Sequence, residues 1–302
     1  MKKIFLLALL VFSSNNMFGQ ANLLNAKNPL EVGDSSSSKA VVEFMDYEYV
    51  DDKDILWSKV VYEFIDLNER LNFPLLFPVN DTKYDDTRKS LWRIIRENIE
   101  NGKISEVYDS NNDNFTEASR IIGKDSTDLE ANIYKNYNIS DIYKSKYVPE
   151  SFVPREIASS ADIFGYVIKG VWYFDKIHAE LRYRLLAIQP YGTDLKTSVD
   201  GEETETGYFW IWYPSIRQIL DDHLVFNDKN NNNRVSFDEL LINRRFSSYI
   251  YKYDNVYGDR EIRDYIRQRD NESYAQWQTR IVMESERIKK EILDFEIDMW
   301  GY

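Results

Sequence analysis

The segment Ile163-Phe164-Gly165-Tyr166-Val167-Ile168-Lys169-Gly170-Val171-Trp172-Tyr173-Phe174 and the run Ala179 to Gln189 that follows it decide the expected fold. Apolar and charged residues alternate in the second run, where Leu181, Tyr183, Leu185 and Ala187 lie between or beside Glu180, Arg182 and Arg184. This period of two is typical of a strand with one buried and one solvated face. Residues 175–178 can close a hairpin, and Tyr208 to Tyr213 is a third strand-like run. We expect an antiparallel meander.

Helical patterns lie before this sheet. A helix beginning at Asp54 is expected because apolar residues recur at helical spacing, namely Trp57, Val60, Val61, Phe64 and Leu71, before Pro74 and Pro78. A second helix is expected from Thr87 to Glu100, with its end at Asn101-Gly102. Its expected buried face consists of Leu91, Trp92, Ile95 and Ile99.

Helical patterns also follow the sheet. One helix is expected from Ser215 to Leu224 and another from about Asp238. The clearest is at the C-terminus, where the apolar stripe consists of Ile288, Ile292, Phe295 and Met299. The expected fold class is therefore α+β, with a helical N-terminal part, a central antiparallel sheet and C-terminal helices.

The N-terminus has the features of an exported protein. Lys2 and Lys3 precede the apolar run Ile4 to Phe12, so residues 1–19 are expected to be a signal peptide. Residues 20–39 are polar and suggest a flexible leader, and a strand is expected at Val41 to Tyr49. The folded domain is expected to span 40–302, with a candidate subdivision near 150.

Composition narrows the classes of function. Hydrophobic residues make up 43% and charged residues 29% of the 302 residues, as in soluble globular proteins. The net charge of -13 opposes binding to nucleic acid and to acidic lipid surfaces. Without any cysteine there is no disulfide, no thiolate nucleophile and no acceptor for an N-terminal lipid. We expect a periplasmic protein with no direct membrane insertion.

A tyrosine- and arginine-rich block, Arg244 to Lys252 with Asn255 to Ile262, is the main candidate for partner binding. Tyrosine, tryptophan and arginine carry much of the binding energy at protein interfaces. The candidate contact residues are Arg244, Arg245, Phe246, Tyr249, Tyr251 and Tyr257, together with Trp210 and Trp212 of the third strand-like run. The alternative is that the block packs on the protein's own core.

A calcium site is a second hypothesis. Oxygen donors follow the spacing of an EF-hand loop at Asp228, Asn230, Asn232, Ser236 and Glu239. Only two of these carry a formal charge, and Asn233 occupies the position where glycine is usual. The alternative is a capped turn between two helices.

Enzymatic motifs are weak. His178 and His223 have no neighbours at metal-ligand spacing, and the chain has no catalytic serine motif and no glycine-rich phosphate loop. No cofactor is expected. A hydrolase built on paired carboxylates is a third hypothesis and predicts a concave pocket containing a carboxylate pair with shifted pKa values.

Several long strings resemble the GldN/PorN family of gliding motility and type IX secretion. They are Asp54 to Lys59, Asp66 to Leu75, Trp210 to Pro214, Arg244 to Lys252, Asn255 to Tyr257, Glu284 to Lys289 and Phe295 to Trp300. The resemblance implies a non-enzymatic subunit that joins the lipoprotein GldK/PorK in a large ring beneath the outer membrane. It also implies contact with the periplasmic part of the motor protein GldM/PorM. The run Asn227 to Asn233 is not associated with that family, which counts further against calcium binding. A calcium-stabilised periplasmic binding module centred on Asp228 to Glu239 is the alternative function.

Overall fold

The computed structural model describes residues 46–80, 88–111, 113, 115–121, 134–135, 156–193, 205–226 and 235–300. Its main element is an eight-stranded sheet in the order β10-β1-β6-β7-β9-β2-β3, with β8 paired to β7. All pairings in it are antiparallel. The strands are β1 (Ile55–Asp66), β2 (Val107–Asp109), β3 (Arg120–Ile121), β6 (Ile163–Asp175), β7 (Glu180–Thr193), β8 (Glu205–Gly207), β9 (Phe209–Trp212) and β10 (Tyr249–Tyr253). Two further strands, β4 (Tyr134–Lys135) and β5 (Glu156–Ile157), pair with each other.

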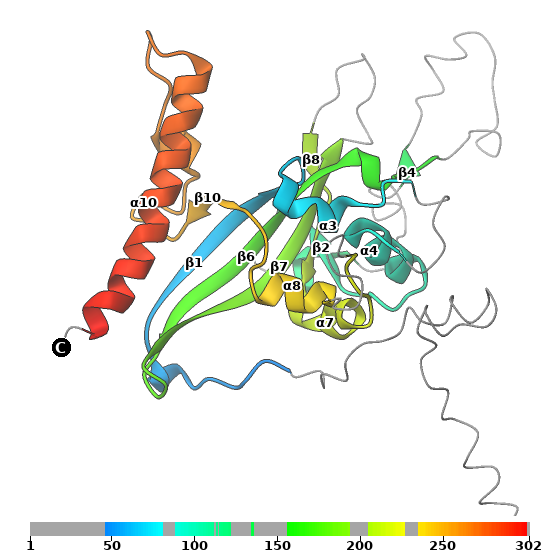
Figure 1. Cartoon of the computed structure of the whole chain (residues 1–302), viewed down its shortest axis with the longest axis horizontal. Coiled ribbons are helices and arrows are strands. Elements are labelled where there is room, and N and C mark those ends of the chain that lie inside the picture. Colours follow the sequence, from blue (N-terminus) through cyan, green and yellow to red (C-terminus); the bar gives the residue numbers. More distant parts are fainter. Residues whose placement is uncertain are drawn as a thin grey trace, which may run out of the picture.

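The helices of the described part lie over one face and along one edge of this sheet (Figure 1). They are α3 (Phe73–Leu76), α4 (Leu91–Glu100), α7 (Tyr213–Asp221), α8 (Phe237–Ile242), α9 (Ile262–Tyr265) and α10 (Tyr274–Trp300). Short 3₁₀ turns are formed by Asp52–Asp54, Arg70–Asn72, Glu117–Ser119 and Ser160–Asp162. None of the helices described is long and apolar enough to cross a membrane. The expected α+β class is confirmed.

The expected hairpin and meander are also confirmed. Strands β6 and β7 pair along their whole length, with Phe174 opposite Leu181 beside the turn. Ala179 has a φ of 53°, in the left-handed region, which reverses the chain within this short turn. Strand β9 pairs with β7 next to the hairpin. The alternation of apolar and charged residues was sufficient to predict strand β7, because one face of its first residues is partly exposed to solvent and carries the charged side chains.

The helix expected to begin at Asp54 is wrong. Residues Ile55–Asp66 form β1, a strand that pairs with β10 on one side and β6 on the other. Val60 and Val61 are β-branched and favour a strand. Both faces of β1 carry apolar residues, with Val61, Tyr62 and Ile65 buried in its second half, and a nearly continuous apolar run does not distinguish strand from helix.

Other parts of the N-terminal half agree better. Helix α4 begins after Ser90, whose Oγ accepts a hydrogen bond from Arg93 N at 3.2 Å, and its expected apolar face is buried. Gly102 follows it with a φ of 70°, as a helix C-terminal stop requires. Of the strand expected at Val41 to Tyr49, residues 41–45 lie outside the described part and residues 46–49 form no strand. Strands from both sides of residue 150 share the main sheet, whereas residues near 150 are outside the described part.

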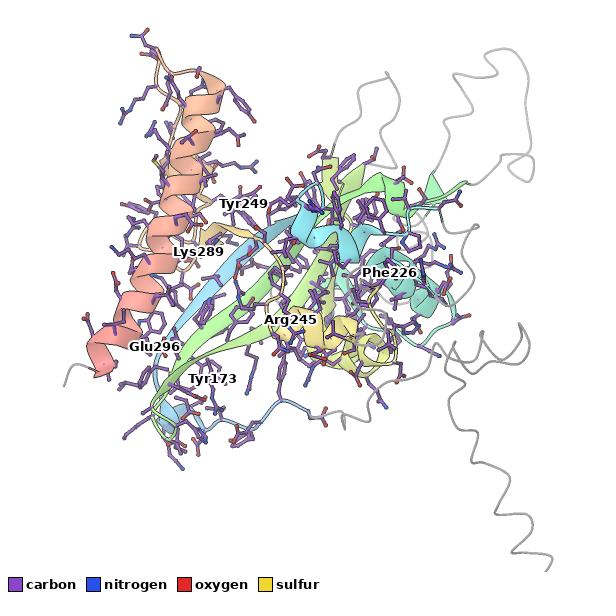
Figure 2. All side chains as sticks on the ribbon, viewed as in Figure 1. Tyr173, Phe226, Arg245, Tyr249, Lys289 and Glu296 are labelled. Atoms are coloured by element: carbon purple, nitrogen blue, oxygen red, sulfur yellow. The ribbon has the colours of Figure 1, made fainter. Side chains whose placement is uncertain are left out.

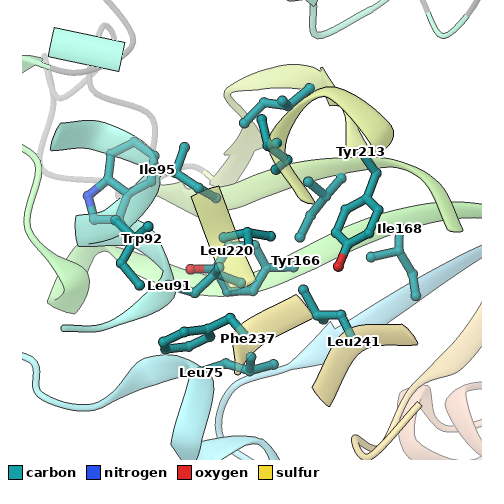
Figure 3. Packing of buried hydrophobic residues seen from close by; sticks show 14 of the residues in the cluster. Leu75, Leu91, Trp92, Ile95, Tyr166, Ile168, Tyr213, Leu220, Phe237 and Leu241 are labelled. Carbon is teal, nitrogen blue, oxygen red and sulfur yellow. The ribbon is translucent and has the colours of Figure 1, made fainter. Parts of the chain in front are cut away.

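The largest core lies between the sheet and helices α4, α7 and α8 (Figure 3). Tyr166 and Ile168 reach it from β6, while Val167, the residue between them, belongs to a cluster on the opposite face. Helix α7 begins with Tyr213 and Pro214, and α8 begins after Ser236. The two faces of the sheet therefore have different partners, because helices cover the face toward Tyr166.

Helix α10 closes the β10 edge of the sheet. Ser285 Oγ accepts a hydrogen bond from Ile250 N at 2.8 Å, and Lys289 Nζ donates to the Ser248 carbonyl at 2.7 Å. Ile288 and Ile292 are buried at this contact, as their stripe predicted, and the same helix stacks Phe295 on Trp57 of β1 with centroids 4.7 Å apart. These contacts occupy the Ile250 N–H of the edge strand, a group that would otherwise be open to pairing with another chain.

Candidate partner-binding surface

Some residues of the tyrosine- and arginine-rich block face the interior of the fold, and others face the solvent. Arg244 forms a bidentate ion pair with Glu63 of β1, with nitrogen–oxygen distances of 2.9 and 2.7 Å. Glu63 is completely buried, and Ser248 Oγ donates a further hydrogen bond to it at 2.5 Å. Burial opposes the charge of Arg244, but the Glu63 carboxylate raises the pKa of the guanidinium above its ordinary value. Arg244 is therefore a structural residue that holds β10 to β1.

Arg245 is oriented differently. Its side chain is 55% exposed and forms an ion pair with Glu239 of α8 at 3.3 Å. Figure 2 places Arg245 near α8 and Tyr249 beside α10. An exposed pair of this kind contributes little to folding. Arg245 is therefore available to a partner.

Tyr249 and Tyr251 of β10 lie on the sheet face that lacks helices α4, α7 and α8, whereas Tyr253, beyond a register shift in the pairing with β1, packs in the cluster of Ile250 and Ile288. Tyr251 meets Tyr62 edge to face with centroids 6.3 Å apart, and Tyr249 lies 5.6 Å from Phe64. Phe64 also meets Tyr191 of β7, at 5.5 Å. Rings from three strands thus form one continuous aromatic surface.

A groove with a volume of about 720 Å³ runs between this surface and the beginning of α10. We call it the aromatic groove and define it by eight rings, those of Tyr62, Phe64, Tyr191, Trp210, Tyr249, Tyr251, Tyr274 and Trp277. Its charged lining residues are Asp66, Asp113, Glu205, Lys252, Glu261 and Arg263. A concave surface with many aromatic rings and a few polar groups is typical of a binding site.

Three tyrosine hydroxyls in the aromatic groove lack a hydrogen bond within the described part of the chain, namely those of Tyr191, Tyr249 and Tyr251. Burial, together with the carboxylates of Asp66 and Glu205, raises the pKa of Tyr249 to about 12. Burial likewise raises the pKa of Tyr191 and of Tyr251. The three hydroxyls therefore remain protonated donors at neutral pH, and half-buried donors of this kind usually find an acceptor.

One end of the aromatic groove is held by Asp113. Its carboxylate accepts hydrogen bonds from the Tyr62 hydroxyl at 2.5 Å and from Lys252 Nζ at 3.2 Å, while Lys169 Nζ donates to its carbonyl at 2.9 Å. Burial alone would raise the pKa of Asp113, but these donors and the two lysine charges lower it. Lys252 is thus committed to Asp113.

A comparison with protein families identifies the family of this chain. The model of the gliding motility associated protein GldN matches residues 50–301. The chain belongs to the GldN family. A comparison with curated proteins finds no match. Membership in the GldN family makes this protein a component of the gliding motility and type IX secretion machinery, as the resemblance implied.

In this GldN-family protein, several of the expected contact residues are inside the fold. Trp210 is 3% exposed and Phe246 is 8% exposed, and both pack within clusters of apolar side chains. Arg244, bound to Glu63, also has a structural contact, and a role of these three residues in binding a partner stays a prediction. Trp212 is partly buried against Phe115, with centroids 5.3 Å apart.

Other expected residues lie at the surface. Tyr249 and Tyr251 line the aromatic groove, and Tyr257 is 55% exposed and stacks on Tyr265 with centroids 5.2 Å apart. With Arg245, they are the predicted contact residues that remain accessible. Their role in binding a partner stays a prediction.

The calcium hypothesis falls mostly outside the described part, which leaves out residues 227–234 and thus Asp228, Asn230 and Asn232. Ser236 Oγ accepts from Glu239 N at 3.0 Å and caps α8, and the Glu239 carboxylate pairs with Arg245. Among the residues described, no group of three or more histidine, aspartate or glutamate side chains could hold a metal ion. Both described members of the expected site already have structural partners.

The sequence did not indicate the groove residues that come from other elements. Phe64 was assigned to a helix, and Tyr191, Tyr274 and Trp277 were not singled out. These residues are far from β10 along the chain, so no local sequence pattern indicates that they share a groove with it.

Helix α10 also presents an outer apolar stripe, since Met283, Leu293 and Ile297 are more than half exposed at 65%, 52% and 66%. Exposed apolar residues grouped on one helix mark a second candidate contact surface.

Proposed function

We propose that this GldN-family protein is a non-enzymatic structural subunit of the periplasmic ring of the type IX secretion and gliding machinery. In this proposal it assembles with the GldK/PorK lipoprotein at the inner face of the outer membrane and contacts the periplasmic region of GldM/PorM. Self-association within the ring accompanies both contacts.

The observation that carries the proposal is the family match over residues 50–301, which includes all of the sheet and α10. The sequence has no cysteine, the residue that receives an N-terminal lipid. A lipoprotein partner would supply attachment to the membrane. The accessible surface adds large residues suited to assembly, around Arg245 and along the outer stripe of α10.

Co-expression with the neighbouring lipoprotein, followed by separation by size, tests this function. We expect a stable assembly of megadalton scale that contains both proteins. Recovery of a monomer without bound lipoprotein, under conditions in which both proteins are expressed and folded, would contradict the proposal.

Surface variants locate the contact. Replacing Arg245 and Tyr249 together with alanine should reduce co-assembly, secretion and gliding, because both side chains are accessible in the monomer. The matched control replaces Arg70 and Tyr49, which are exposed elsewhere; Tyr49 is 86% exposed. Thermal unfolding of both double variants separates a lost contact from a lost fold. Equal loss of assembly in both would contradict the assignment of this surface.

A further inference from the structure

We infer that the aromatic groove binds an extended, basic peptide segment of a partner protein. The inference concerns one monomer and its groove, and it does not depend on whether the protein forms a ring. It rests on the hydrogen-bonding capacity of the groove, its uncompensated charge and the shape of its lining.

The free hydroxyls indicate an extended backbone. Tyr191, Tyr249 and Tyr251 offer three donors from a half-buried surface, with no acceptor in the described part of the chain. In a helical peptide most backbone carbonyls already accept hydrogen bonds within the helix, whereas an extended or polyproline-type segment leaves its carbonyls free to accept from these hydroxyls. Peptides in that conformation dock on aromatic-lined grooves in which rings pack against the chain and hydroxyls bond its carbonyls. The groove therefore fits an extended segment better than a helix.

The charge of the groove indicates a basic segment. Lys252 is paired with Asp113 at 3.2 Å and Arg263 with Glu261 at 2.5 Å. The remaining carboxylates that line the groove, Asp66 and Glu205, have no cation partner within the described residues. Both carboxylates raise the pKa of Tyr249, and Arg263, which is paired with Glu261, lowers it, so the two carboxylates without a cation partner lie on the same side of the groove as the free hydroxyl of Tyr249. A lysine or arginine of the ligand would pair with them.

A second copy of this chain is a poor occupant. The exposed apolar stripe of α10 is the part of another copy that could enter a groove, but the charges beside it have both signs, Arg287 and Lys290 among Glu286, Asp294 and Asp298. This face therefore offers no excess of cations to Asp66 and Glu205, and the whole chain has a net charge of -13. Like charges at close range oppose such a contact.

Selection from a random, phage-displayed dodecapeptide library on the purified full-length protein tests the inference. We expect enrichment of peptides that combine lysine or arginine with proline or other apolar residues. The strongest of them, synthesised with a fluorescent label, is then titrated by anisotropy. Enrichment of acidic peptides only, or no enrichment over a blank surface, would overturn the inference.

Variants assign that binding to the groove. Exchanging Asp66→Asn together with Glu205→Gln should raise the Kd of the peptide about tenfold. Both exchanges remove the negative charge that would pair with the peptide's lysine or arginine, and they keep the volume of the side chain. The control exchanges Asp270→Asn and Asp298→Asn, two exposed carboxylates outside the groove, and should leave the Kd unchanged. An equal Kd for the groove variant and the wild type would place the peptide elsewhere and overturn the inference.

The tyrosine donors are tested separately with Tyr191→Phe and Tyr249→Phe in one chain, which keeps the rings and therefore the packing. We expect a weaker Kd with an unchanged melting temperature. An unchanged Kd in this folded variant would contradict the role given to the hydroxyls. A negative result in these tests would not contradict the proposed co-assembly with the lipoprotein, because they measure peptide binding to the protein alone and the co-assembly experiment measures a complex of two proteins.

Discussion

Arg244 and Arg245 are neighbours in sequence but belong to different regions of the molecule. Arg244 reaches under β10 to the buried carboxylate of Glu63, whereas Arg245 remains in solvent beside Glu239. The backbone at Arg244 has a φ of 52°, in the left-handed region, and turns the two side chains apart before β10 begins. Composition typical of an interface can therefore serve the core at one residue and the surface at the next.

The same contrast separates the two faces of the sheet. Ile168 of β6 lies in the main core under the helices, and Val167 beside it faces the cluster that includes Tyr62 and Trp210. One face has its aromatic rings enclosed, and the other leaves rings and hydroxyls in an open groove. The difference comes from which face the helices cover, since both faces are rich in apolar residues.

Replacing Arg244 should have the largest effect on stability. Arg244→Ala leaves the Glu63 carboxylate buried without its cation, and a broken buried pair costs about 3–5 kcal/mol. Urea unfolding measures this loss. Arg245→Ala is the matched control and should change the free energy of unfolding by less than about 0.5 kcal/mol. Similar losses in the two variants would remove the distinction between these arginines.

The two sides of α10 provide the next test. Ile288→Ala creates a cavity against β10 and should lower the free energy of unfolding by about 2–5 kcal/mol. Leu293→Ala, on the outer stripe, should change it by less than about 0.5 kcal/mol but reduce co-assembly. Chemical denaturation and separation by size give the two readouts. A stabilising role for Leu293 comparable to that of Ile288 would mean that the outer stripe belongs to the monomer's own core.

Acid should weaken the end of the groove held by Asp113. Because its folded-state pKa is lowered, the stabilisation is complete above the unfolded value of about 3.9 and is lost as the pH falls through the lower, folded value. The difference in melting temperature between wild type and Asp113→Asn should therefore shrink below about pH 4. Melting curves over pH 3 to 7, with Asp270→Asn as control, measure it. If the difference in melting temperature between wild type and Asp113→Asn does not change with pH, the ion pair of Asp113 with Lys252 is not its source.

Calcium should have the smallest effect. The Glu239 carboxylate pairs with Arg245, so calcium would have to compete with this ion pair. We expect millimolar calcium to leave the melting temperature unchanged, with magnesium as the control. A rise specific to calcium would support the EF-hand-like alternative, because a ligand that binds the folded state stabilises it.

The accuracy of sequence-based prediction differed along the chain for a physical reason. In β7 and α10 one face is solvated, so polar residues mark the period and the elements were identified. In β1 both faces carry apolar residues, and the spacing of Trp57, Val60, Val61 and Phe64 fits a helix as well as a strand. The expected contact set was divided by tertiary contacts, because Arg244 and Phe246 turn into the fold before β10 begins, whereas Tyr249 and Tyr251 of β10 line the groove.

By itself the sequence determined the α+β class, the β6–β7 hairpin, the buried stripe of α10 and the GldN family, because these depend on short-range periodicity and on long characteristic strings. Only the tertiary structure decided that β1 is a central strand and that Arg244 is internal. It also brought Tyr62, Tyr191 and Trp277 to one groove. Burial depends on residues that are distant along the chain, and a local pattern does not record which of its faces they will cover.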